Sequence, residues 1–267
     1  MKTTIVCVTA VLGAVFVSAP ALAQETAAPT PEITVTGTAA VLSQYRFRGI
    51  AQSDNKPVVQ MSVTVQDKSG FYISAWGSSA SSNGDDVIDI GGTEIDVYGG
   101  YSHTFAKSGV TVDGGLYGYL YPGAASGEYY ELYGDVSKAV GPFGLKVGAN
   151  WAPKQHYFDY FDTATKYNMY EYGEVTFSPP KLSAVTLHTH LGHTGGGFNY
   201  TKAYWDYTAG ASYKWKNLTF DASVVGTNVS KSDAREAPLT TIDGEVSPFQ
   251  TYRAAKAVGV ISLTASF

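Results

Sequence analysis

The sequence predicts an all-β protein, a transmembrane antiparallel β-barrel of about twelve strands arranged as an up-and-down meander. Three observations predict this fold. The N-terminus has the pattern of an export signal. The rest of the chain alternates apolar and polar residues in segments of about ten residues. The connections between these segments are alternately short and long, as in outer-membrane barrels.

The N-terminal segment predicts export and cleavage. Residues 1–23 have the features of a signal peptide: a positive charge at Lys2, an apolar run over 5–17, and small residues at Ala21 and Ala23 before the expected cleavage. Residues 24–33 form a Pro-, Ala- and Thr-containing periplasmic linker, and residues 34–267 form the barrel. No later stretch is apolar over enough residues to predict a transmembrane helix.

The composition narrows the classes of function. Charged residues are 15% of the chain, below the roughly 25% of a typical soluble domain. The net charge of −5 argues against a nucleic-acid partner. The one cysteine, Cys7, lies in the segment that is expected to be removed. The mature chain is therefore predicted to have no thiol chemistry, no disulfide and no thiolate metal site.

The period-two alternation divides the chain into twelve predicted strands. They cover residues 34–46, 57–66, 70–80, 93–105, 109–120, 129–138, 144–152, 167–178, 182–192, 203–215, 218–227 and 257–267. Tight connections follow every even-numbered strand and longer ones follow every odd-numbered strand. This alternation of short and long connections predicts short periplasmic turns and longer outer loops, with both chain ends on the periplasmic side.

One predicted strand shows which face meets lipid. On one face of 203–215, aromatic residues stand at both ends and small apolar residues in the middle, and the opposite face is polar. The ten residues from Trp205 to Trp215 rise ~3.3 Å each and project to ~25 Å at a ~40° tilt, the height of an outer-membrane apolar band. The final strand ends at Phe267, which resembles the C-terminal signal of the barrel-assembly machinery and makes that machinery an expected partner.

The segment 43–60, SQYRFRGIAQSDNKPVVQ, resembles the N-terminal signature of the TorF family of porins from proteobacterial outer membranes. Further matches are Gly70-Phe71-Tyr72, Trp76-Gly77-Ser78, Glu94-Ile95-Asp96 with Tyr98 and Gly100-Tyr101, and Glu131-Leu132-Tyr133-Gly134. The resemblance covers most of the mature chain and weakens after about Tyr170. It implies a Gram-negative outer-membrane barrel with an expected pore role, and it implies no solute and no catalytic residue.

The alternation places more acidic than basic residues on the inward face. The predicted pore-lining residues are Glu94, Asp96, Asp113, Glu131, Asp135, Lys146, Glu174, Asp206, Lys214 and Asp221. An acidic wall would favour cations. The alternative is that these groups pair and fill a closed barrel, because twelve strands lie between the filled eight-stranded and the open sixteen-stranded barrels.

Arg46 and Arg48 stand at the end of the first predicted strand, at the expected pore mouth. One hypothesis is a clamp for an anion or carboxylate. The alternative is a structural salt bridge to Asp54 or to a neighbouring strand. Elsewhere, His188 and His190 share one strand face and are weak candidate metal ligands, since no third ligand accompanies them and a solvated pair is the more common case.

The leading hypothesis is a channel for passive diffusion of small hydrophilic solutes or ions, with no cofactor and no enzymatic activity. One alternative is an outer-membrane hydrolase, for which His156 and His193 lie in predicted outer loops without a nucleophile motif. Another is a closed structural or adhesive barrel that acts through its outer loops. Residues 228–256, the longest connection, either fold inward as a constriction or remain outside.

Overall fold

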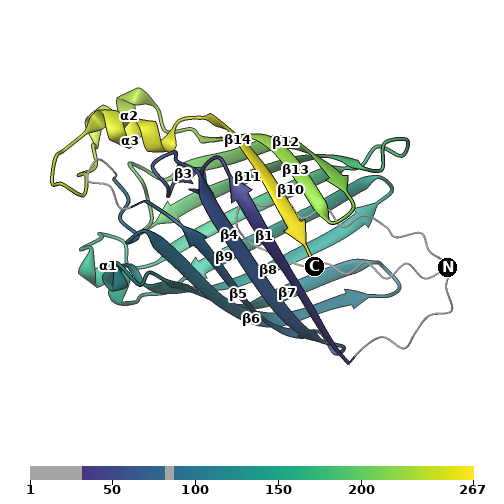
Figure 1. Ribbon diagram of the computed structural model, residues 1–267. Helices are drawn as coiled ribbons and strands as arrows, with labels where there is room; N and C mark the ends of the chain where they lie inside the picture. Colours follow the sequence, from purple (N-terminus) through teal and green to yellow (C-terminus); the bar gives the residue numbers. More distant parts are fainter. Residues whose placement is uncertain (1–31, 82–86) are drawn as a thin grey trace.

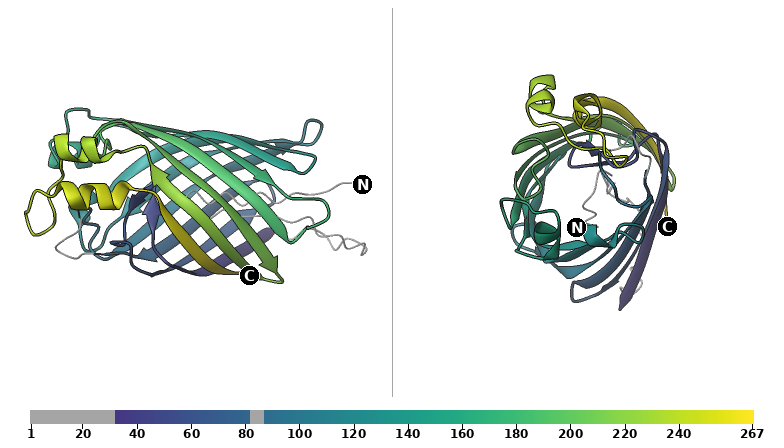
Figure 2. Two further views of the ribbon diagram at one scale, coloured as in Figure 1. Left: turned by 90° about the horizontal axis from the view of Figure 1, so that it is seen from above. Right: turned by 90° about the vertical axis from the view of Figure 1, so that its left-hand side faces the viewer.

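The computed structural model describes residues 32–81 and 87–267. Twelve long strands form one closed antiparallel barrel in which each strand pairs with its neighbours in the chain, and β14 pairs with β1 to close the ring (Figures 1 and 2). The strands are β1 (Ile33–Leu42), β4 (Val58–Asp67), β5 (Phe71–Ser79), β6 (Thr93–Phe105), β7 (Val110–Leu120), β8 (Tyr129–Val140), β9 (Phe143–Ala152), β10 (Asn168–Phe177), β11 (Val185–Gly196), β12 (Tyr204–Trp215), β13 (Leu218–Thr227) and β14 (Val258–Ser266). The predicted fold class is confirmed.

The two ends of the barrel differ. One end has the tight turns, and the other has the long connections with η1 (Ala125–Gly127), α1 (His156–Tyr160), α2 (Lys231–Glu236) and α3 (Pro248–Ala255) (Figure 1). The end with the helices is called the outer end and the end with the turns the inner end. The C-terminus lies towards the inner end. No helix of the described residues is long and apolar enough to cross a bilayer.

Most predicted strand boundaries agree with the structure, and 93–105 and 218–227 agree at both ends. Two do not. The first strand ends at Leu42 rather than at 46, and the strand predicted over 182–192 runs from Val185 to Gly196. His193 therefore lies in β11 and not in an outer loop. Of the predicted segments, the signal peptide 1–23 and all but the last two residues of the linker 24–33 lie outside the described residues.

The first strand was predicted too long because the chain continues into a second β structure. After Leu42 it forms a separate two-stranded sheet, β2 (Arg46–Phe47) and β3 (Ile50–Ala51), which does not join the sheet of the barrel. The alternating residues of this segment give the same period as a wall strand. The segment is buried, whereas wall strands are exposed on one side.

Side-chain burial alternates along the barrel strands, because one face of each strand meets the exterior and the other meets the interior. In β12, Trp205, Tyr213 and Trp215 are exposed, and Asp206 and Ser212 between them are buried. The same contrast recurs in β6 and β8, where exposed apolar residues alternate with buried acidic or tyrosine residues. The exterior is apolar and the interior is polar, which suits a barrel surrounded by lipid.

Glycines in β6 and β7 leave room for a tyrosine that lies against the inner wall. A Cβ on Gly100 or Gly115 would stand 2.7 Å from the Tyr133 hydroxyl. A Cβ on Gly115 would also stand 2.1 Å from the carbonyl oxygen of Gly99. The Tyr133 hydroxyl bonds the hydroxyl of Tyr72 on β5, so its side chain reaches across two strands. This position depends on the missing side chains of both glycines.

Substituting Gly115→Ala should therefore lower the free energy of unfolding by about 1–3 kcal/mol, because the new methyl group overpacks the wall. Urea titration of the folded barrel in detergent measures the change. Gly118→Ala is the matched control on the same strand, since its Cβ would meet nothing closer than the Val97 carbonyl oxygen at 3.4 Å. Equal effects of the two substitutions would contradict this account of Tyr133.

Candidate functional site: the barrel interior

The side chains predicted to line the pore lie on inward-facing, alternate positions of seven of the strands. Glu94, Asp96, Asp113, Glu131, Asp135 and Asp206 are buried, and Lys146, Glu174, Lys214 and Asp221 are partly exposed on the same inward faces. Glu94, Asp96 and Glu131 are 0–2% exposed. The most deeply buried of these charges are near the outer end, and the more exposed ones are nearer the inner end.

Residues 45–52, here called the internal hairpin, turn into the barrel interior. Arg48 and Gly49 form its two-residue turn with φ values of 47° and 79°, between the paired residues Phe47 and Ile50. Positive φ at both central positions is the type I′ geometry that two-residue hairpins prefer. A Cβ on Gly49 would lie 2.8 Å from the Gly226 carbonyl oxygen, so the turn fits closely against β13.

Arg48 projects from this turn across the interior. Its Nη2 donates to Oε2 of Glu131 over 2.6 Å, and both side chains are almost fully buried. Glu131 lies on β8, the fifth strand from β1 around the ring. The guanidinium carbon is 4.1 Å from the ring centre of Tyr170 and 4.7 Å from that of Phe47. The ion pair and the two rings join the hairpin to the far wall.

The outer loop 228–257 holds the hairpin in place through hydrogen bonds and apolar contacts. The Nη1 atom of Arg46 donates to the carbonyl oxygens of Ala254 at 2.7 Å and Lys256 at 3.1 Å, where α3 ends. Ala254 and Ala255 pack with Ile50 and other apolar residues of the hairpin and wall. Burial lowers the pKa of the Arg46 guanidinium to about 10. The hairpin and α3 therefore form one packed unit.

An ion pair reinforces this unit. Arg253 on α3 bonds the carboxylate of Asp54, and Lys56 lies 2.9 Å from the same carboxylate. Burial raises the pKa of Asp54, but the hydrogen bonds from Arg253 and Lys56 outweigh it and hold this pKa below its ordinary value. The contact links the segment after the hairpin to the longest outer loop.

The two arginines thus have different roles. The salt bridge expected as an alternative exists at Arg48, but its partner is Glu131 across the interior rather than Asp54 or an adjacent strand. Arg46 bonds carbonyl and amide oxygens, including Oδ1 of Asn55 at 2.5 Å. In this structure neither guanidinium points outward from the barrel, since both are buried.

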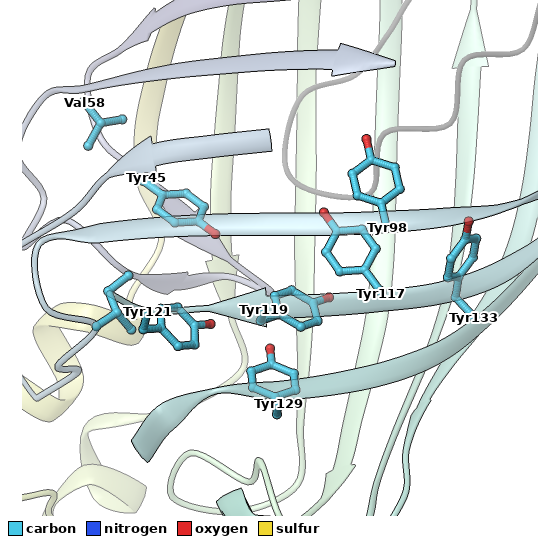
Figure 3. Packing of buried hydrophobic residues seen from close by; sticks show 9 residues of the cluster. Tyr45, Val58, Tyr98, Tyr117, Tyr119, Tyr121, Tyr129 and Tyr133 are labelled. Carbon is cyan, nitrogen blue, oxygen red and sulfur yellow. The ribbon is translucent and has the colours of Figure 1, made fainter. Parts of the chain in front are cut away.

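A cluster of tyrosines fills the interior beside the hairpin. Tyr117, Tyr119 and Tyr121 follow one another along β7 and its end, with Tyr129 of β8 facing them (Figure 3). The rings of Tyr119 and Tyr129 stack with centres 4.3 Å apart, and Phe47 of the hairpin meets Tyr119 at 5.7 Å. Sequence reasoning treated aromatic residues as lipid-facing girdles and missed this cluster. The inward alternation of tyrosine in 117–121 was the available signal.

The two histidines bind carboxylates separately. His188 Nε2 lies 2.6 Å from Asp221, and His190 lies 3.2 Å from Glu174 and 3.3 Å from Asp206. Within the described residues, no group of three or more His, Cys, Asp or Glu side chains is arranged to hold a metal ion. The candidate metal role of the pair receives no support from its geometry.

The interior is less densely packed towards the inner end. The side chains of Glu174, Asp221 and Lys146 are 42%, 22% and 20% exposed, against 4% for Arg48. Lys146 pairs with Asp135 at 3.4 Å. The wall of β14, β1 and β4 carries partly exposed serine and threonine side chains rather than charges. The charged side chains nearer the inner end are therefore more accessible to solvent than those packed around Arg48.

A closed twelve-stranded barrel with an apolar exterior and a charged interior is the architecture of outer-membrane β-barrels, and porins of known structure share it. The chain belongs to the Gcw_chp family, described as bacterial proteins of unknown function, whose family model matches residues 25–251. This match does not carry the TorF name, although the barrel fold implied by that resemblance is confirmed. No curated protein matches the sequence.

Solved porins share the fold. The KdgM porin superposes with a TM-score of 0.52 at 14% identity, covering 87% of this chain and 99% of its own. A second KdgM structure, in complex with disordered oligogalacturonate, gives the same values. The NanC porin gives a TM-score of 0.51 at 12% identity, covering 88% and 99%. At these identities the likeness concerns the fold.

If α3 holds the hairpin in place, Arg253→Gln should expose it. Trypsin cleaves after Arg46 and Arg48, which are buried in the folded protein. Loss of the ion pair with Asp54 should raise cleavage at these two sites several-fold, measured by mass spectrometry on the folded barrel. Arg235→Gln on α2 is the control, since Arg235 is exposed. Unchanged cleavage in both variants would show that α3 does not retain the hairpin.

Proposed function

We propose that this protein is an outer-membrane channel for passive diffusion of small hydrophilic solutes or ions, with a preference for cations. The observation that carries the proposal is the distribution of charge. Eight carboxylates lie on the interior faces, from Glu94 to Asp221, while the exterior of the strands is apolar. Charged groups on the inner wall of a barrel select the ions that pass it.

The balance of interior charge supports the cation preference. Against the eight carboxylates stand Arg46, Arg48, Lys146 and Lys214, together with the two histidines. Arg48 is already paired with Glu131, and Lys146 with Asp135. Near the inner end, Glu174 and Asp221 are in contact with histidines and partly exposed. The interior as a whole thus holds more carboxylates than arginine and lysine side chains.

The internal hairpin sets the narrowest part of the proposed path. Twelve strands enclose more space than wall side chains alone fill, and the hairpin with the tyrosine cluster occupies the outer half. The fold shared with the KdgM and NanC porins and the TorF resemblance both favour a channel. The predicted signal peptide and the terminal Phe267 favour export and insertion by the barrel-assembly machinery, in the outer membrane of a Gram-negative cell.

A closed barrel that acts through its outer loops is the second candidate, and the dense packing around Arg48 favours it. A hydrolase has less support. His156 is exposed on α1, with its ring tilted against that of Tyr160, and His193 faces outward with its ring centre 4.9 Å from that of Trp205.

The cation preference is tested by planar-bilayer recordings in a salt gradient. The double variant Glu174→Gln/Asp221→Asn removes two partly exposed interior charges. Unit charges ~4 Å apart interact by about 1 kcal/mol even in water, so the cation-to-anion permeability ratio should fall several-fold. Glu171→Gln on the same strand as Glu174 is the control, because Glu171 faces outward and is exposed.

A reversal potential that moves towards zero only in the interior double variant supports the channel. A folded wild-type barrel that never conducts would overturn the proposal and leave the closed barrel.

A further inference from the structure

We propose that the pocket holding the Arg48 guanidinium is a binding site for solutes that carry a guanidinium or primary ammonium group, and that Arg48 occupies this site as a tethered substitute. The inference rests on the proposed function, since it names the class of solute for the same interior. It starts from one fact: the barrel wall already binds a cation that comes from a different segment of the chain.

The wall side of the pocket recognises a flat cation with several kinds of contact. Oε2 of Glu131 accepts hydrogen bonds from Arg48, from the Tyr119 hydroxyl at 3.1 Å and from Nδ2 of Asn150 at 3.0 Å. The Tyr170 ring faces the guanidinium at 4.1 Å. A buried carboxylate beside an aromatic face is a general way to bind guanidinium and ammonium groups.

Arg48 uses this site incompletely. Among the described residues, its Nε and Nη1 atoms are buried without a hydrogen-bond partner, as are Oε1 of Glu131 and Oδ1 of Asn150. A free guanidinium commonly bonds a carboxylate through two parallel hydrogen bonds, whereas Arg48 makes one. Because Arg48 is held by the hairpin turn, it leaves acceptor atoms of Glu131 and Asn150 without a hydrogen bond, and a free solute can bond them.

A second carboxylate lies next to the site. Tyr170, which stacks on Arg48, donates its hydroxyl to Oδ1 of Asp206 over 3.1 Å, and Oδ2 of Asp206 is buried without a partner among the described residues. Asp206 also borders the hairpin turn, with its Cβ 2.9 Å from where a Cβ of Gly49 would stand. Two carboxylates, Glu131 and Asp206, thus lie beside the guanidinium, although Asp206 also contacts His190 at 3.3 Å. Their charge favours a cationic over an anionic solute.

The hairpin that supplies Arg48 is built to be displaced more easily than a wall strand. Its strand pairs, Arg46 with Ala51 and Phe47 with Ile50, lie within the hairpin, and it shares no ladder with the barrel. Among the described residues, its one backbone bond to the segment after β5 is from the Ser81 N–H to the Gln52 carbonyl oxygen at 3.1 Å. Withdrawal of the hairpin therefore breaks no ladder of the wall, and the main bonds it must break are those of Arg48 to Glu131 and of Arg46 to Ala254 and Lys256.

The test is calorimetry with methylguanidinium chloride at millimolar concentration on the folded barrel in detergent. In Arg48→Ala the site is free of its tethered occupant, so saturable binding is expected. Binding to the wild type should be about tenfold weaker, because Arg48 competes for the site. Arg48→Ala/Glu131→Gln should lose the binding, while the control Arg48→Ala/Glu171→Gln should keep it. Urea, which is planar but neutral, should not bind.

A second measurement uses the unaltered protein in case Arg48→Ala does not fold. Methylguanidinium should increase tryptic cleavage after Arg46 and Arg48 in the wild type, because a bound solute displaces the hairpin, and urea at the same concentration should not. No binding to a folded Arg48→Ala barrel, or binding that survives Glu131→Gln, would overturn the inference. Calorimetry does not require conduction. Binding by a silent barrel would therefore refute the channel alone, and conduction without binding would refute this site alone.

Discussion

Closure of the strand ladder within an apolar exterior is the constraint on which the rest of the structure depends. Pairing of β1 with β14 leaves no free sheet edge, so the backbone of the wall strands is satisfied within the sheet. Every charged residue of the central wall must then face inward or be placed near a rim. The charges of β6, β8 and β12 are concentrated in the interior for this reason, and they must find partners there.

The twelve-stranded circumference has a second consequence. Its interior is too wide for wall side chains to fill, unlike that of an eight-stranded barrel. At the outer end the internal hairpin and the tyrosine cluster fill the remaining space, and they meet where Phe47 contacts Tyr119. At the inner end the charged side chains of Glu174 and Lys146 stay partly exposed. The interior therefore has a densely packed outer half and an inner half whose charged side chains are partly exposed to solvent.

The wall could be predicted from the sequence because its pattern has a single cause. The alternation from Trp205 to Trp215 reports directly on lipid outside and polar groups inside, so strand number, facing and loop parity all follow. The inward positions of Glu94 and Asp96 follow from the same rule. A wall residue needs only its own neighbours in the chain to be placed.

The hairpin could not be predicted in this way, because its contacts join distant segments. Residues 43–47 continue the period of a strand, and nothing local shows that the chain leaves the wall after Leu42. The partner of Arg48 is 83 positions away in the sequence. The helices of the outer loop left a signal that was not used: Ser230 and Asp233 form a capping box, and Ser247 precedes Pro248 at the start of α3.

Because Arg48 and Glu131 form a buried ion pair, replacement of Arg48 by another cation is more favourable than withdrawal of Arg48 alone. Removing one member of a buried pair leaves an uncompensated charge and costs about 3–5 kcal/mol, whereas the net contribution of an intact pair is small. Withdrawing Arg48 from Glu131 without replacement is therefore unfavourable. Replacing it by another cation keeps the carboxylate paired throughout. The same energetics that hold the hairpin in place thus allow a cationic solute to release it, and they give an anion no comparable means of doing so.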